Sequence, residues 1–252
     1  MGCTSTLGSI ASQTQDSNSP NASGCALTSH MRTITALDST PTTPLQHHRA
    51  VQPIDAGRAA PRRAGQYGVR IRLDALRDVL ALRDESLAAW VVEHCGPDLT
   101  ELDEWFETER PAADYMADLM LGRPHANENA HLYGYCVKVL CELWGAPMAN
   151  DGWWGMRYGW FDAVTKTVAQ AGVTYDFTDL IIGGPGADVP PPDDFPAMGH
   201  ITRDDLQAHL DLLSAPELAR IDDQDVVTAV EQVRSWLREC RREDTDLVCF
   251  YH

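Results

Sequence analysis

Two apolar segments near the ends of the folded region decide the fold: Tyr67–Leu73 (YGVRIRL) and Leu247–Tyr251 (LVCFY). In the first segment, apolar residues alternate with Arg70 and Arg72, which is the period of a half-buried strand. We predict that the two strands pair and tie the ends of the domain together. Because two strands alone are marginally stable, we expect helices to pack on one face of the pair.

Helical signals fill the sequence between these strands. Capping residues, apolar positions three or four apart and glycine stops predict helices. The predicted segments are 74–82, 84–94, 113–121, 127–144, 157–171, 202–213, 214–221 and 222–241. The stretch 183–199, which contains five prolines, is expected to be a long loop. The fold class is therefore α+β and predominantly helical: a helical bundle with a small sheet that pairs the N- and C-terminal strands of the domain.

The first 66 residues differ in composition from the rest of the chain. They are rich in Ser, Thr, Pro, Ala and Gln and poor in large apolar side chains, which predicts a disordered leader before a single globular domain at 67–252. A true translation start at Met31, with a misannotated beginning, is the alternative. Residues 8–16 lack the apolar run of a secretory signal, so we expect a cytoplasmic protein.

Charge and cysteine content exclude several classes of function. The chain has a formal net charge of −17, and residues 67–252 hold 34 acidic against 15 basic residues. Such a domain repels phosphate backbones and anionic membranes, so no nucleic acid or membrane partner is expected. The seven cysteines contain no CxxC pair, which indicates reduced, apolar thiols rather than disulfides or a zinc site. No cofactor is predicted.

The proline-rich stretch carries one candidate site. Asp193 and Asp194 together with His200 could bind a divalent metal or perform acid-base chemistry. The ordinary interpretation is structural: the aspartates cap a turn and Phe195 anchors the loop in the core.

A second candidate is rich in aromatic residues. Trp153 and Trp154 are adjacent and cannot both point into the core, so one of them could line a pocket or an interface together with Arg157. Core packing is the alternative. His131 follows Glu128 at the Glu-x-x-His spacing of di-iron bundles, but that chemistry needs two copies and the sequence has one, so no metal site is predicted.

Several short motifs carry a family resemblance. They are His131–Tyr135 (HLYGY), Leu140–Gly145, Asn150, Trp153, Arg157, Val189-Pro190, Asp193–Pro196 (DDFP), Gly199 and Phe250-Tyr251. Together they resemble an uncharacterised family of small cytoplasmic proteins from streptomycetes and related actinobacteria, a domain of unknown function. The resemblance covers about residues 67–252. It implies the origin and a single domain, but no activity.

Three functions compete. The first is a non-catalytic acidic binding or regulatory module, similar to an immunity protein, with a basic protein partner. The second is a small hydrolase-like or metal-binding enzyme, in which the Asp193–His200 loop meets Trp153, Arg157 and His131 in one pocket. The third is a homo-oligomer that assembles through exposed aromatic residues. We favour the first.

Overall fold

The computed structural model describes residues 65–125, 129–153, 155–192 and 195–252. The predicted disordered leader lies outside the described residues, apart from its last two positions. Glu128, Trp154, Asp193 and Asp194 also lie outside them.

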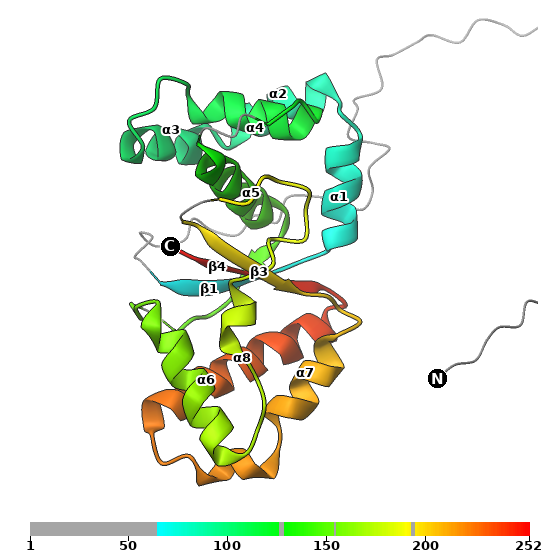
Figure 1. Cartoon of the computed structure of the whole chain (residues 1–252). Coiled ribbons are helices and arrows are strands. Elements are labelled where there is room, and N and C mark those ends of the chain that lie inside the picture. Colours follow the sequence, from blue (N-terminus) through cyan, green and yellow to red (C-terminus); the bar gives the residue numbers. More distant parts are fainter. Residues whose placement is uncertain (1–64, 126–128, 154, 193–194) are drawn as a thin grey trace, which may run out of the picture. The chain divides into compact units, whose positions relative to one another are not determined.

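A four-stranded antiparallel sheet forms the centre of the domain (Figure 1). Strand β1 (Gln66–Ile71) pairs with β4 (Asp246–Tyr251), and Val69 lies opposite Val248. This confirms the predicted pairing of the two ends. The sheet is larger than predicted, because β2 (Ala146–Pro147) pairs with β1 and β3 (Ala197–Ile201) pairs with β4.

Helices cover both faces of this sheet, so the prediction of helices on one face is wrong (Figure 1). One face carries the upper layer: α1 (Leu73–Ala81), α2 (Glu85–His94), α3 (Gly96–Trp105), α4 (Ala112–Leu121) and α5 (Ala130–Trp144). The other face carries the lower layer: α6 (Gly159–Ala171), α7 (Leu206–Leu213) and α8 (Gln224–Arg242), with two 3₁₀ helices, η2 (Phe177–Leu180) and η3 (Pro216–Arg220). The reason lies in β4, where Val248 and Phe250 pack into the upper core while Leu247, Cys249 and Tyr251 pack into the lower core.

Local signals located several helix ends as predicted, whereas α7 begins at Leu206 rather than at the predicted Thr202. The Asp84 carboxylate accepts a hydrogen bond of 2.8 Å from Leu87 N at the start of α2. Gly122 adopts a left-handed conformation with φ of 58° and ends α4. Helix α8 begins one residue later than predicted, because Asp223 rather than Asp222 caps it.

Three segments differ from the predictions. Helix α3 was not predicted, although Pro97 occupies a position in its first turn that favours proline. The expected helix at 214–221 is the 3₁₀ helix η3. The expected loop ends early because β3 begins at Ala197, which places His200 on a strand.

Cysteine side chains pack as apolar groups throughout the described residues. Cys95, Cys136, Cys141, Cys240 and Cys249 are all buried and unbridged. Burial raises the pKa of the Cys240 and Cys249 thiols to about 12, so both stay protonated at neutral pH. No helix in the described part of the chain is long and apolar enough to cross a membrane.

Candidate functional site

The structure places Trp153 in the core rather than in a pocket. Its side chain is completely buried, its indole Nε1 donates a hydrogen bond of 3.0 Å to Ala229 O, and its ring lies 4.8 Å from that of Phe161. Arg157, by contrast, is exposed just before α6. The core-packing interpretation therefore holds for Trp153.

The two candidate histidines lie on the other side of the sheet from Trp153. On β3, Ile201 packs into the lower core and Met198 into the upper core, so alternation puts the His200 side chain on the upper face. There its Nδ1 lies 2.9 Å from Gly184 O. His131, on α5 of the upper layer, packs against the ring of Phe106 at 4.9 Å. Among the described residues, the sheet therefore separates His131 and His200 from Trp153, so these three side chains do not line one pocket.

The structure instead brings two of the predicted segments together around Tyr251. The ring of Tyr158, next to Arg157, lies 5.9 Å from that of Tyr251, and the ring of Phe195 lies 5.4 Å from that of Tyr251. We call these three residues the Tyr251 cluster. Tyr158 and Phe195 are 46% and 40% exposed, so Phe195 is a partly open contact rather than a core anchor. Burial raises the pKa of Tyr251, so its hydroxyl stays protonated at neutral pH.

A buried charged group that the sequence analysis missed lies on the upper face of β1. Lys138 is 1% exposed, and its Nζ lies 3.1 Å from Glu142 Oε1 and 5.3 Å from the centre of the Tyr67 ring. The Tyr67 hydroxyl donates a hydrogen bond of 2.9 Å to the same carboxylate oxygen. The available signal was composition, because Lys138 is one of only two lysines in a chain with 18 arginines.

Comparison with known proteins places the chain in a family. A family model described as a domain of unknown function, DUF7691, matches residues 67–252. The chain belongs to this family. The match spans the motifs that carry the resemblance and confirms it at the level of a domain of unknown function. No curated protein and no solved structure matches the chain.

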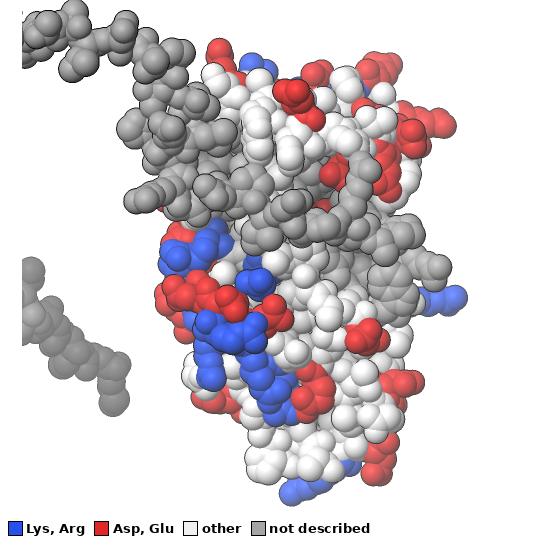
Figure 2. Space-filling view, turned by 180° about the vertical axis from the view of Figure 1, so that it is seen from behind, with Lys and Arg blue, Asp and Glu red and all other residues white. Residues whose placement is uncertain are grey.

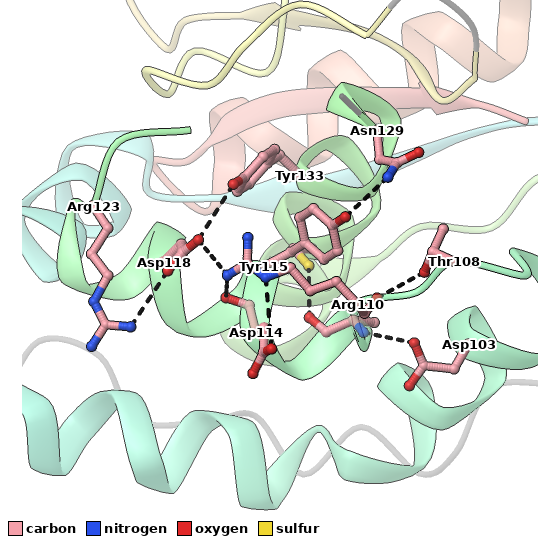
Figure 3. Close-up of polar contacts among 11 residues, drawn as sticks. Asp103, Thr108, Arg110, Asp114, Tyr115, Asp118, Arg123, Asn129 and Tyr133 are labelled. Atoms are coloured by element: carbon pink, nitrogen blue, oxygen red, sulfur yellow. Dashed lines mark hydrogen bonds and ion pairs between the residues drawn. The ribbon is translucent and has the colours of Figure 1, made fainter. Parts of the chain in front are cut away.

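A buried acid of the DUF7691 domain links helices of its upper layer (Figure 3). Asp118 on α4 is 6% exposed, and its carboxylate accepts hydrogen bonds of 2.5 Å from Arg110 and 3.4 Å from Arg123. The Tyr133 hydroxyl of α5 lies 3.5 Å away. The Arg110 guanidinium also covers the ring of Tyr115 at 4.6 Å. The charges of this network pair with one another, so we assign it a structural role.

Acidic residues of the DUF7691 domain concentrate on one surface of the upper layer. Residues 84–114, which run from α2 through α3 into the first turn of α4, contain ten acidic residues and one arginine. We call this surface the acidic face. Figure 2 shows red side chains with little blue over the helices at the top of the view. Within the described residues the structure gives no ion pair for Glu104, Glu107 or Glu109, and all three are exposed.

The acidic face includes one exposed tryptophan. Trp105, the last residue of α3, is 44% exposed and is flanked by Glu104 and Glu107. The described residues contain no group of three or more His, Cys, Asp or Glu side chains that could hold a metal ion. The acidic face thus combines negative charge with an exposed indole.

Proposed function

We propose that the DUF7691 domain is a non-catalytic binding or regulatory module that takes a basic protein partner on its acidic face. The observation that carries the proposal is the ratio of ten acidic residues to one arginine over 84–114, with most of the carboxylates exposed. An excess of one charge accelerates encounter with an oppositely charged partner and orients it. A cytoplasmic location and an actinobacterial origin belong to the same proposal.

Trp105 can supply an apolar contact with the partner, in addition to the electrostatic attraction. Exposed ion pairs contribute little net affinity, whereas a tryptophan that becomes desolvated in an interface often contributes about 2 kcal/mol or more, roughly a 30-fold change in affinity. The acidic side chains around Trp105 would then form the polar rim of the interface. We therefore expect the indole to anchor the partner and the carboxylates to set the rate of association.

The positions of the candidate catalytic residues support a binding role rather than an enzymatic one. His131 and His200 are separated from Trp153 by the sheet. The carboxylates of buried Asp118 and half-buried Glu142 accept hydrogen bonds or pair with basic side chains. These groups therefore support the fold, whereas the structure gives Glu104, Glu107 and Glu109 of the acidic face no ion pair within the described residues.

The test compares three variants of the full chain. The first carries Glu104→Gln, Glu107→Gln and Glu109→Gln, and the second carries Trp105→Ala. The third is a matched control with Asp162→Asn, Asp204→Asn and Asp222→Asn, which removes three exposed charges from the lower layer. Asp103 is left intact because it accepts a hydrogen bond of 2.6 Å from Ala112 N.

Each variant is used to recover partners from the cytoplasm of the source organism, and the recovered protein is purified and titrated by calorimetry. We expect a basic protein in stoichiometric amount, an affinity at least about tenfold lower for the first two variants, and unchanged affinity for the control. Affinity should fall as salt rises. Recovery of no stoichiometric partner, or equal loss in all three variants, would overturn the proposal.

A further inference from the structure

An apolar groove runs beside the edge strand β3, on a surface separate from the acidic face. It has a volume of about 400 Å³, within the usual range for ligand sites. Ile181, Ile182, Val189, Ala197 and Met198 line it together with glycines and prolines of the preceding loop. Ile182 is 56% exposed. A groove of this kind, with an exposed aliphatic residue at its wall, is suited to an apolar segment of polypeptide.

The lack of charged side chains among the described residues of the groove restricts which ligands can bind there. Residues 181–192 contain a single charged residue, Asp188, although the domain as a whole is strongly acidic. None of the side chains that the structure describes in the lining of the groove is charged, so a charged group of a ligand would find no partner among them. The occupant should therefore be uncharged where it enters the groove.

The chain enters the sheet close to this groove. Gly65 N donates a hydrogen bond of 2.8 Å to His252 O, directly before β1. Gln66 and Ala197 both pair with Tyr251, so the start of β1 lies two strand spacings, or roughly 10 Å, from the groove residue Ala197. A short length of preceding chain is enough to cover that distance.

The nearest pair of large aliphatic residues before β1 belongs to Val51-Gln52-Pro53-Ile54. The intervening residues 55–64 contain no apolar side chain larger than proline, and ten residues span at most about 35 Å. Proline at position 53 favours an extended conformation of polyproline type, in which residues three apart share a face. Val51 and Ile54 can then enter the groove together.

Charge complementarity supports the same occupant. The intervening segment carries Arg58, Arg62 and Arg63 against a single acid, Asp55, whereas residues 67–252 are acidic by 34 to 15. The arginines are therefore attracted to the surface of the domain while the uncharged residues 51–54 match the groove.

We propose that the groove beside β3 binds residues 51–54 of the same chain, with Val51 and Ile54 as anchors. A tether of about ten residues gives an effective concentration in the millimolar range, so weak intrinsic affinity is sufficient. The docked segment covers apolar surface next to the edge strand, and an external apolar peptide can bind there only by displacing it.

The test uses the full chain labelled with ¹⁵N and compares two double variants. The first carries Val51→Ser and Ile54→Ser. The matched control carries Ile34→Ser and Leu37→Ser, an aliphatic pair with the same spacing farther from β1. We expect the amide resonances of Gly183, Gly184 and Ala187 to shift in the first variant and to stay unchanged in the control.

A synthetic peptide of residues 48–58 provides the second measurement. Added at millimolar concentration to the first variant, it should return these resonances toward their positions in the unaltered chain. Unchanged groove resonances in the first variant, equal shifts in both variants, or no response to the peptide would overturn the proposal. A response that disappears on dilution of the unaltered chain would also overturn it, because it would show docking between two copies.

Discussion

The acidic face and the surface around α8 use carboxylates in different ways. At the surface where α8 meets β1, arginines and acids alternate, as the mixed blue and red side chains of Figure 2 show, and Arg70 Nε lies 3.2 Å from Glu239 Oε1. At the acidic face, one arginine stands among ten acids. Net charge alone therefore does not identify a binding surface in this domain. The informative property is the number of carboxylates that no neighbouring side chain neutralises.

The largest loss of stability should come from removing the most buried carboxylate near α8. Asp246 is 4% exposed and accepts hydrogen bonds of 2.8 Å from both Leu73 N and Arg203 N, which links the start of α1 to the end of β3. Asp246→Ala leaves both donors without this partner, so we expect the free energy of unfolding to fall by about 3 kcal/mol. Urea denaturation measures the change.

An exposed acid supplies the control for this experiment. Asp222→Ala should change the free energy of unfolding by less than about 0.5 kcal/mol, because Asp222 lies at the surface before α8. A loss below about 1 kcal/mol for Asp246→Ala would show that this carboxylate contributes no more than an exposed ion pair.

Substitution of Asp74 should cause a smaller loss of stability that depends on pH. Hydrogen bonds from Arg72 and then Arg203 lower the pKa of its carboxyl group below the usual value. A lowered folded-state pKa gives stability that is complete above the unfolded pKa of about 3.9 and is lost as the pH falls below it. Asp74→Asn should therefore cost about 1 kcal/mol at pH 7, a value typical of an exposed pair, and progressively less below about pH 4.

Urea denaturation of the unaltered chain and the Asp74→Asn variant at pH 7, 5 and 3 tests this dependence. In a background that carries Arg72→Met and Arg203→Met, the cost of Asp74→Asn should largely disappear at every pH. A cost that persists in full at pH 3, or that survives removal of both arginines, would contradict the assigned cause.

The sequence predicted those parts of the fold that depend on local signals. The alternation in 67–73 and the apolar run 247–251 located the central strands, and Asp84 and Gly122 marked helix ends. Helices on both faces were predictable in principle, because five consecutive apolar residues in β4 indicate a strand buried on both sides. The sequence analysis predicted helices on only one of the two faces of the sheet.

Other features depended on tertiary context. Strand β3 contains Gly199, where an added Cβ would lie 2.6 Å from the Asp179 carbonyl oxygen, so close packing against η2 rather than strand propensity selects the residue. Trp153 looked like a pocket residue because its neighbour is also a tryptophan, whereas the contact that buries it comes from α8, 76 positions away. The Tyr251 cluster likewise joins three segments that lie far apart in the sequence.

The smallest expected effect on stability belongs to the acidic face. Glu104→Gln, Glu107→Gln and Glu109→Gln together should change the free energy of unfolding by less than about 0.5 kcal/mol, because all three side chains are exposed and glutamine has a helix propensity similar to that of glutamate at position 104 in α3. The sign should be toward stabilisation. Glu104 lies in the last turn of α3, where the helix dipole disfavours negative charge, and neighbouring acids repel it.

Urea denaturation at low and high salt distinguishes this explanation from a structural role. Any gain at low salt should disappear at about 1 M salt, where the screening length falls to about 3 Å. The control variant with Asp162→Asn, Asp204→Asn and Asp222→Asn has the same change in net charge. A loss of more than about 1 kcal/mol confined to the glutamate variant would mean that these carboxylates hold the fold together, and the distinction between the two surfaces would then fail.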